Sequence, residues 1–261
     1  MLRYLVVAVA SVILVSGCAS YPAAPRVTLP PTGASFDYQL GGSYPAPDGA
    51  AIVERDSTSK PAKGSYGICY VNGFQSQPGV TWPKELLVHR SSGTLLVDPG
   101  WPDEHLFDIS TAAKRAAIAD RLGASIRRCA RVGFQAVEFD NLDSYTRSKG
   151  ALTKKDAAAF ATLLVTRSHS AGLAVAQKNA AELTSRSKPI GFDFAMTEEC
   201  DRYRECATFT KAYGDRVFDI EYVGELRGSA ASVCARSTVA TIIRDRDLVA
   251  RGKSGYFYRA C

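Results

Sequence analysis

Short runs of apolar and β-branched residues alternate along the chain with longer segments in which apolar residues recur at helical spacing. Helical patterns cover residues 109–132 and 153–172, and a shorter one lies near residues 204–213. Thr153 and Asp156 form a capping-box pattern at the start of the second helix, and Gly172 suits its end. The runs predicted as strands are residues 36–40, 51–55, 66–71, 94–98, 136–140, 173–177, 193–196, 217–221 and 238–243.

The repeated order of strand and helix is typical of parallel β/α units, which build either a closed (β/α)8 barrel or an open doubly wound sheet. No G-x-G-x-x-G segment follows a predicted strand, so the usual dinucleotide-binding fingerprint of the open sheet is missing. The units fill a length that is typical of a barrel with one domain. The sequence therefore predicts an α/β protein, a single-domain (β/α)8 TIM barrel over residues 36–261.

The segment before residue 36 is predicted to lie outside the barrel. Residues 4–15 form an apolar run behind the basic Arg3, and this run is shorter than the roughly 20 residues of a membrane-spanning helix. The run ends in Leu-Val-Ser-Gly-Cys at residues 14–18, which resembles a bacterial lipobox and predicts lipidation of Cys18. Residues 1–17 are thus predicted to be a signal peptide. A secretory peptide with a fortuitous cysteine is the alternative.

Residues 18–35 contain four prolines and predict an extended, flexible linker between the lipidated cysteine and the barrel. The sequence therefore predicts an exported protein that is lipid-anchored at the bacterial cell envelope, in the cell membrane or the outer membrane. We expect it to be a monomer.

The other cysteines are even in number, as expected of disulfides in an oxidising compartment. Cys200 and Cys206 are close enough in sequence to close a small loop, and a bond between Cys234 and Cys261 is a weaker expectation. A zinc site is the alternative, but the three histidines lack the close Cys/His spacing of such sites. The six cysteines are Cys69, Cys129, Cys200, Cys206, Cys234 and Cys261.

Polar and ionisable residues stand at the ends of most predicted strands. The carboxyl ends of barrel strands meet at one face, where active sites lie, so these side chains are expected to meet across one cleft. Carboxylates without nearby histidines suit glycoside hydrolysis, which needs an acid and a second carboxylate as nucleophile or base. No G-x-S-x-G elbow, P-loop or H-E-x-x-H segment supports another chemistry. The strand-end residues are Asp98, Asp140, Lys178, Asn179, Glu198, Glu199, Glu221, Tyr222, Arg244 and Asp245.

Five segments occur in this order along the chain: FDYQLGG at 36–42, VEFDNLDSY at 137–145, LAVAQKNAAEL at 173–183, FDFAMTEECDRYREC at 192–206 and VFDIEY at 217–222. Together they resemble glycoside hydrolase family 114, whose members are endo-α-1,4-polygalactosaminidases with a (β/α)8 barrel. The resemblance implies a retaining mechanism without a cofactor, with Asp140 as nucleophile and Glu198 as acid/base. Glu199 is an open alternative to Glu198, because only one of two adjacent strand residues points inward.

Further residues near the strand ends are expected to contact the substrate. Three of them have structural alternatives: Asp143 could cap a turn, Lys178 could pair with Glu221, and Trp101 could pack instead of stacking on a sugar. Glu138 shares a strand face with Asp140 and is expected to tune it. The predicted substrate-binding residues are Asp37, Tyr38, Asp98, Trp101, Asp143, Tyr145, Lys178, Asn179, Glu221 and Tyr222.

The net charge of +6 is opposite to that expected of a protein that binds a cationic galactosamine polymer. Local cleft carboxylates should decide substrate choice, because charges beyond about 8–10 Å are screened. Nucleic-acid binding is rejected, since the basic residues lack interleaved aromatic ones. Two alternatives to the enzyme remain: a non-catalytic carbohydrate-binding lipoprotein, and a metal-dependent hydrolase using Glu138, Asp140 and Asp143. We expect no metal and no cofactor.

Overall fold

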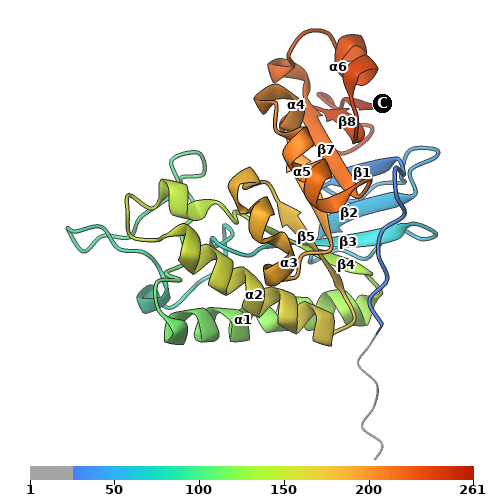
Figure 1. Ribbon diagram of the computed structural model, residues 1–261. Coiled ribbons are helices and arrows are strands. Elements are labelled where there is room, and N and C mark those ends of the chain that lie inside the picture. The colour runs from blue at the N-terminus through green and yellow to red at the C-terminus, as the bar shows by residue number, and fades with distance from the viewer. Residues whose placement is uncertain (1–25) are drawn as a thin grey trace, which may run out of the picture.

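The computed structural model describes residues 26–261 and shows a nearly closed barrel of mostly parallel strands (Figure 1). One sheet holds nine strands in sequence order, of which the first eight pair in parallel and the last pairs antiparallel with its neighbour. The strands are β1 (Phe36–Gln39), β2 (Ile52–Asp56), β3 (Tyr66–Asn72), β4 (Ala136–Asp140), β5 (Ala174–Lys178), β6 (Phe194–Glu198), β7 (Val217–Tyr222), β8 (Ala240–Arg244) and β9 (Tyr258–Ala260).

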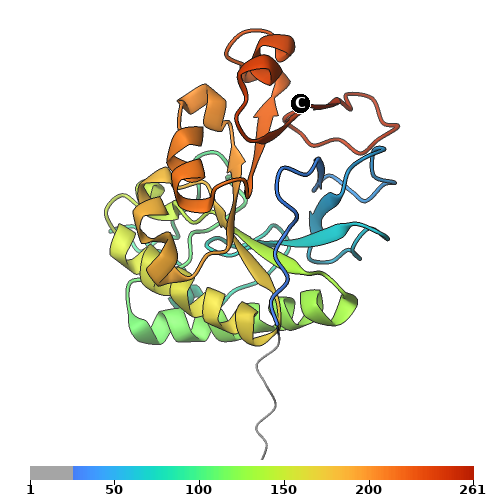
Figure 2. The same ribbon diagram turned by 45° about the vertical axis from the view of Figure 1, so that its right-hand side comes forward.

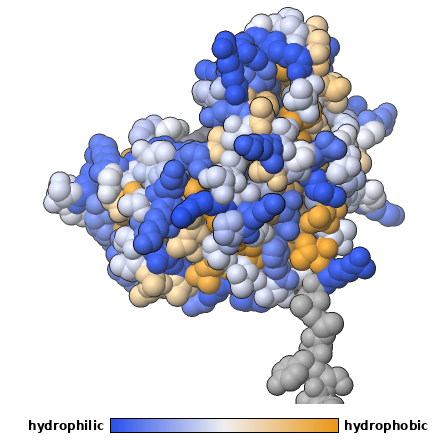
Figure 3. Space-filling model, viewed as in Figure 1, coloured by the Kyte–Doolittle hydropathy of each residue, from blue (hydrophilic) through white to orange (hydrophobic). Residues whose placement is uncertain are grey.

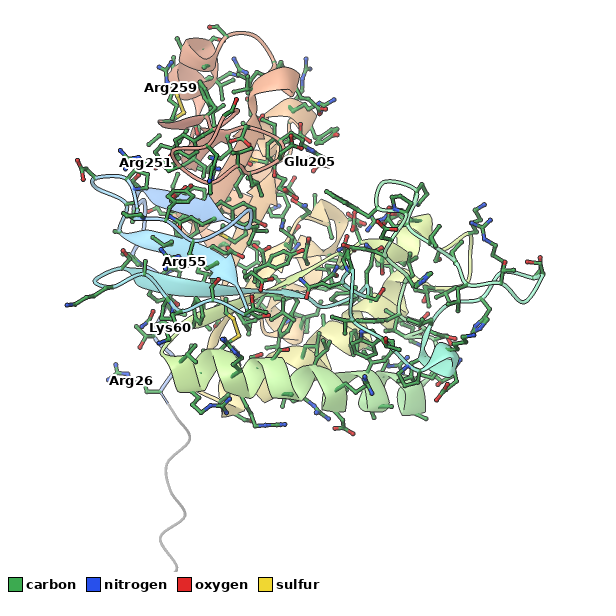
Figure 4. All side chains as sticks on the ribbon, turned by 180° about the vertical axis from the view of Figure 1, so that it is seen from behind. Arg26, Arg55, Lys60, Glu205, Arg251 and Arg259 are labelled. Atoms are coloured by element: carbon green, nitrogen blue, oxygen red, sulfur yellow. A yellow bond between two sulfur atoms is a disulfide. The ribbon has the colours of Figure 1, made fainter. Side chains whose placement is uncertain are left out.

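The helices lie unevenly around the barrel. The long α1 and α2 pack side by side against β4 and β5, whereas no helix of the described residues follows β1 or β2. Figure 4 shows the outer face of these first strands without a helix over it. Helix bounds are α1 (Ala112–Val132), α2 (Lys154–Ser170), α3 (Ser187–Ile190), α4 (Cys200–Tyr203), α5 (Cys206–Tyr213) and α6 (Ala230–Arg236), with 3-10 turns η1 (Lys84–Leu86), η2 (Ser144–Arg147), η3 (Ala181–Arg186) and η4 (Val223–Glu225).

Eight of the nine predicted strands are confirmed within two residues at each end, but the strand predicted at residues 94–98 is wrong. Leu95 and Val97 instead form isolated antiparallel bridges to His89 and His105 within the long β3–α1 connection. The barrel has no place for another strand there, because β4 pairs directly with β3. An apolar run that pairs locally has the same sequence pattern as a barrel strand.

The two long helices begin and end where their sequence patterns indicate. Thr153 and Asp156 form the predicted capping box at the start of α2, and Gly172 follows its end with a positive φ of 78°. Thr111 caps α1, whose buried stripe of Ile118, Leu122 and Ile126 packs towards the sheet. These helices bury the outer face of β3–β5.

Three disulfides join the described cysteines. Cys200–Cys206 and Cys234–Cys261 confirm the two pairs expected from the sequence. The third, Cys69–Cys129, was not predicted from the sequence. It joins α1 to β3 and closes a loop of 60 residues. Closing a loop of that length stabilises a fold by about 4 kcal/mol in the chain-entropy view.

The barrel interior is layered along the strands. Strand alternation turns every second side chain inward. The lower inward positions are apolar, and edge-to-face contacts of Phe218 with Phe36 and Phe194 fill the floor. The inward positions nearest the carboxyl ends are polar, and the next section describes them. The apolar floor comprises Phe36, Ile52, Ile68, Ala136, Ala174, Phe194, Met196, Phe218, Ile220 and Ile242.

Strands β1 and β8 are joined by side chains rather than by a ladder of backbone hydrogen bonds. The fully buried Arg244 of β8 donates to the carbonyl oxygen of Tyr38, to Asp37 Oδ1 at 3.3 Å and to the Tyr44 hydroxyl at 3.1 Å. The Tyr258 hydroxyl donates to the carbonyl oxygen of Phe36 at 2.8 Å. Figure 2 shows the C-terminal segment beside the first strands, where these bonds form.

The face of the molecule seen in Figure 3 carries mostly polar residues, with small apolar areas between them. Within residues 26–261, no helix is both long enough and apolar enough to span a membrane. The predicted signal peptide and Cys18 lie outside the described residues.

Replacing Arg244 with methionine is expected to lower the free energy of unfolding by about 3–5 kcal/mol, because the Asp37 carboxylate loses its buried cation. Denaturant unfolding measures the effect. Arg251→Met, an exposed position on the same C-terminal segment, is the control and should change stability by less than about 0.5 kcal/mol. Equal unfolding midpoints for the two variants would show that Arg244 does not stabilise the junction between β1 and β8.

Candidate active site

A single buried lysine stands at the centre of the polar layer. Lys178, at the end of β5, is 1% exposed and its Nζ lies 2.8 Å from Glu138 Oε1, 3.3 Å from Asp140 Oδ1 and 3.6 Å from Glu198 Oε2. It also donates to the Tyr38 hydroxyl at 2.9 Å. One ammonium group thus links three carboxylates from two strands, β4 and β6.

Strand alternation accounts for this convergence. Glu138 and Asp140 are two residues apart on β4 and therefore point to the same side, into the barrel. Lys178 and Glu198 occupy the last residues of β5 and β6, so both reach the carboxyl-end face. The cluster is the inward-facing set of three neighbouring strands, β4 to β6, rather than a feature of one loop.

Glu198 and Glu199 occupy different environments. Glu199 follows the last residue of β6 in the left-handed region with φ of 63°, and its carboxylate pairs with Arg202 at 2.6 Å and Arg246 at 3.4 Å. Glu198 instead accepts from the Tyr222 hydroxyl and from Asn179 Nδ2 at 3.3 Å. The geometry therefore places Glu198, and not Glu199, beside Lys178.

Asp140 is held in its ionised form. Burial alone would raise the pKa of this carboxyl, but the Lys178 ammonium, the Tyr70 hydroxyl and the Asn141 amide outweigh it and lower the pKa below the usual value. Tyr70 donates to Oδ2 at 2.8 Å and the Asn141 N–H donates to Oδ1 at 2.8 Å. The Asp140 side chain keeps 21% exposure, so a ligand can reach it.

Glu198 is oriented by two neighbours that were predicted to contact the substrate. Asn179 holds both the Glu198 carboxylate and, through Oδ1, the Glu198 backbone N–H at 2.7 Å. Burial and the nearby Glu198 raise the pKa of Tyr222, so its phenol stays protonated and donates. The Glu198 side chain is 27% exposed. Both exposed carboxylates of the cluster therefore face accessible space.

The loop after β4 is held by an arginine that the sequence did not single out. Arg147 donates to Asn141 Oδ1 at 3.0 Å and forms ion pairs with Asp98 at 2.6 Å and Asp143 at 2.9 Å. Asp98 is almost fully buried in this contact, and Asp143 makes no side-chain cap to η2. These two predicted substrate-binding residues thus support the loop that carries Asn141.

Two other predicted residues lie on the loop side of the carboxyl-end face. The Tyr145 hydroxyl contacts Glu182, which links the β4 and β5 loops. Trp101 is 59% exposed, so it is not packed into the core as the structural alternative proposed. Its indole is free to contact a ligand.

Two residues predicted to bind substrate do not face the cluster. Asp37 is fully buried on the side of β1 opposite to Tyr38, where Arg244 and the Tyr44 hydroxyl bind it. Glu221 faces outward from β7 and accepts the Asp201 backbone N–H at 2.9 Å. The alternative pairing of Lys178 with Glu221 is therefore also wrong. Alternation places Tyr38 and Tyr222, the adjacent residues, inside instead.

The three carboxylates of the metal hypothesis do not form one ligand set. Asp143 pairs with Arg147, and the Lys178 ammonium lies against Glu138 and Asp140. The group of possible ligands that does come together in residues 26–261 comprises Cys200, Cys206 and Asp219, but its cysteines are joined in a disulfide.

Sequence reasoning missed Tyr70 and Glu54. Both lie two residues after an inward-facing isoleucine, Ile68 on β3 and Ile52 on β2, so the period of two contained the signal. They were overlooked because neither stands at the very end of its strand.

Comparisons with known proteins address the family and the fold of the chain. The model of glycoside-hydrolase family GH114 matches residues 18–261. The fold is similar to Aspergillus fumigatus Ega3, crystallised in complex with galactosamine, with a TM-score of 0.72 and 21% identity over 92% of this chain and 100% of that one. It is also similar to the glycoside hydrolase domain of PelA from Pseudomonas aeruginosa, with a TM-score of 0.58 and 16% identity over 84% and 98%. No curated protein sequence matches the chain.

Replacing Tyr70 with phenylalanine is expected to raise the pKa of Asp140 towards its ordinary value, because a hydrogen bond to the ionised form is lost. A carbon-13 NMR titration of the Asp140 carboxyl measures the shift. Tyr66→Phe on the same strand is the control, since its hydroxyl donates to the Thr28 carbonyl oxygen instead. An unchanged Asp140 titration in Y70F would contradict the assigned hydrogen bond.

Proposed function

The chain belongs to glycoside-hydrolase family GH114, and on that premise we propose that it cleaves α-1,4-linked galactosamine polymers within the polymer chain. The observation that carries the proposal is the pair of part-exposed carboxylates, Asp140 and Glu198, beside the buried Lys178. The enzyme is a glycoside hydrolase; its polymer, endo action and stereochemistry are the proposed parts.

The geometry favours retention. Asp140 Oδ1 and Glu198 Oε2 lie 3.3 Å and 3.6 Å from the same Lys178 Nζ, so these two oxygens are at most about 7 Å apart, the sum of the two distances. Retaining enzymes hold their carboxyl groups about 5–5.5 Å apart, and inverting ones about 6.5–9.5 Å apart. For these two oxygens the bound allows the whole retaining range and excludes the upper part of the inverting range.

A retaining mechanism gives the two carboxyl groups different roles. In the first step Glu198, as the acid, gives a proton to the leaving glycosidic oxygen, while the ionised Asp140 attacks the anomeric carbon and forms a glycosyl-enzyme ester. In the second step Glu198 takes a proton from water, whose oxygen displaces Asp140. Lys178, Tyr70 and the Asn141 amide stabilise the carboxylate that leaves.

A cationic amino-sugar polymer fits the local charge. Asp140 and Glu198 are the part-exposed members of the cluster, and Lys178, its cation, is buried beneath them. The galactosamine in the Ega3 crystal structure supports the same substrate class. The net charge of +6 acts over longer distances, where salt screens it. A non-catalytic barrel would be favoured by loss of Asp140 or Glu198, and the chain has both.

We further propose that the enzyme is exported as a monomer and lipid-anchored at Cys18 in the cell envelope. The lipobox-like residues 14–18 motivate the anchor. The three disulfides support an oxidising compartment, since such bonds are rare in the cytosol.

Asp140→Asn and Glu198→Gln are each expected to lower the cleavage rate of a deacetylated galactosamine polymer by about 10²–10⁴-fold, because each removes a reacting carboxyl. Product sizing of the digest measures the rate and the endo mode. Asp120→Asn and Glu85→Gln, both exposed away from the barrel interior, are the matched controls. Wild-type rates in D140N and E198Q would make this site assignment wrong.

Cys18→Ser is expected to abolish incorporation of labelled palmitate and to move the protein from the membrane fraction to the soluble one. Ser20→Ala, two residues further along, should keep both label and membrane fraction. If C18S still carries the label, the lipid is attached elsewhere.

A further inference from the structure

Two carboxyl groups meet in the barrel interior below the reacting pair. Glu54 on β2 and Glu138 on β4 are both fully buried and point into the barrel interior. Neither Glu54 oxygen receives an N–H or O–H from another residue, and Glu138 Oε2 receives none either. Two carboxyl groups with three unpartnered oxygens cannot both be ionised away from water, so the pair must hold a proton.

The contacts decide which of the two carries this proton. Glu138 Oε1 accepts from Lys178 Nζ at 2.8 Å and from the Tyr38 hydroxyl at 3.2 Å, and both contacts stabilise its anion. Glu54 has no cation within bonding distance among the described residues, so nothing compensates an anion there and Glu54 is the member that carries the proton.

We propose that Glu54 is a permanently protonated positioning residue, which donates its proton to the free oxygen of Glu138 and so holds Glu138 as the anion that fixes Lys178 beneath Asp140 and Glu198. The inference rests on the proposed function for its catalytic consequence. Burial raises the pKa of Glu54 well above its ordinary value, and the adjacent Glu138 raises it further. Glu54 itself touches neither the reacting carboxyls nor open space.

Because Glu54 holds the proton, Glu138 is left as a counter-ion of Lys178 whose charge does not change during the reaction. Glu198 gains and loses a proton in each turnover, and Asp140 becomes an ester, so both change their charge beside Lys178. Glu138 takes no part in these proton transfers; burial raises its pKa to about 7, and the proton on Glu54 leaves it ionised above that pH. The titratable groups that act on the pair are Tyr38 from β1, Tyr70 from β3, Asp140 from β4, Lys178 from β5 and Glu198 from β6.

The first test counts charge and needs no substrate. Glu54→Gln replaces a neutral carboxylic acid by a neutral amide of nearly equal shape that still donates to Glu138. Its electrophoretic mobility by capillary electrophoresis at pH 7 should equal that of the wild type. Glu85→Gln, an exposed glutamate, should shift the mobility by one charge. A shift of E54Q equal to that of E85Q would show that Glu54 is ionised and overturn the proposal.

The second test uses the pH dependence of stability. The folded-state pKa of Glu54 lies above the ordinary value of about 4.3 that the unfolded chain has, so the folded protein keeps a proton that the unfolded one releases. Stability from this group is complete below about pH 4.3 and is lost as the pH rises towards the folded pKa. The Tm of E54Q relative to wild type should therefore increase from pH 4 to pH 8. A constant difference would contradict the proposal.

The third test separates positioning from simple packing. Glu54→Leu fills similar space without a donor and is expected to lower kcat about tenfold relative to E54Q, which keeps one. Equal kcat values in the two variants would remove the positioning role. If E54L does not fold, the mobility and Tm of E54Q still decide the protonation. If the wild type does not cleave the galactosamine polymer, the proposed function fails while the charge measurement stands.

Discussion

The burial of one ammonium group among carboxylates is the constraint on which the rest of this site depends. Moving Lys178 or any one of its partners out of water alone costs several kcal/mol per ion. The cost is offset only because the lysine contacts Glu138, Asp140 and Glu198 at once and donates to the Tyr38 hydroxyl. The burial of each charged group is therefore tolerated only while the other groups of the cluster are present. The same contacts that make the cluster tolerable in a folded protein also keep Asp140 ionised and within reach of Glu198.

Strand alternation supplies the positions that this cluster requires. Because β4 to β6 are parallel neighbours in register, their inward-facing terminal residues meet on one face without help from a flexible loop. The same rule turns Asp37 and Glu221 outward, where Arg244 and the backbone of α4 bind them. A shift of one residue in any strand would exchange the two sets. The apolar floor below fixes the register, since only one register buries Phe194 and Phe218 inside the barrel.

The sequence predicted much of this from local patterns. Strand positions, the capping box of α2 and two disulfides follow from residues close together in the chain, and the strand-end rule brought Asp140, Lys178 and Glu198 together. It could not predict contacts between distant residues that have no local signature. Three such contacts join elements that are 60 or more residues apart: the Cys69–Cys129 disulfide, the bonds of Arg244 to β1, and the Glu54–Glu138 pair. The false strand at residues 94–98 has the opposite cause, a correct β pattern whose partners are local.

A purely apolar upper layer would make a more stable barrel, because buried ion pairs are often weaker than well-packed hydrophobic residues of the same volume. The polar layer is therefore not explained by folding. Its composition is explained by chemistry: two carboxyls must remain accessible, one ionised and one able to exchange a proton, while the groups that tune them stay dry. The buried Glu54 and Glu138 are the part of this arrangement furthest from solvent. Their charges are set by the barrel rather than by the substrate, and so the environment of Asp140 and Glu198 is fixed before a polymer binds.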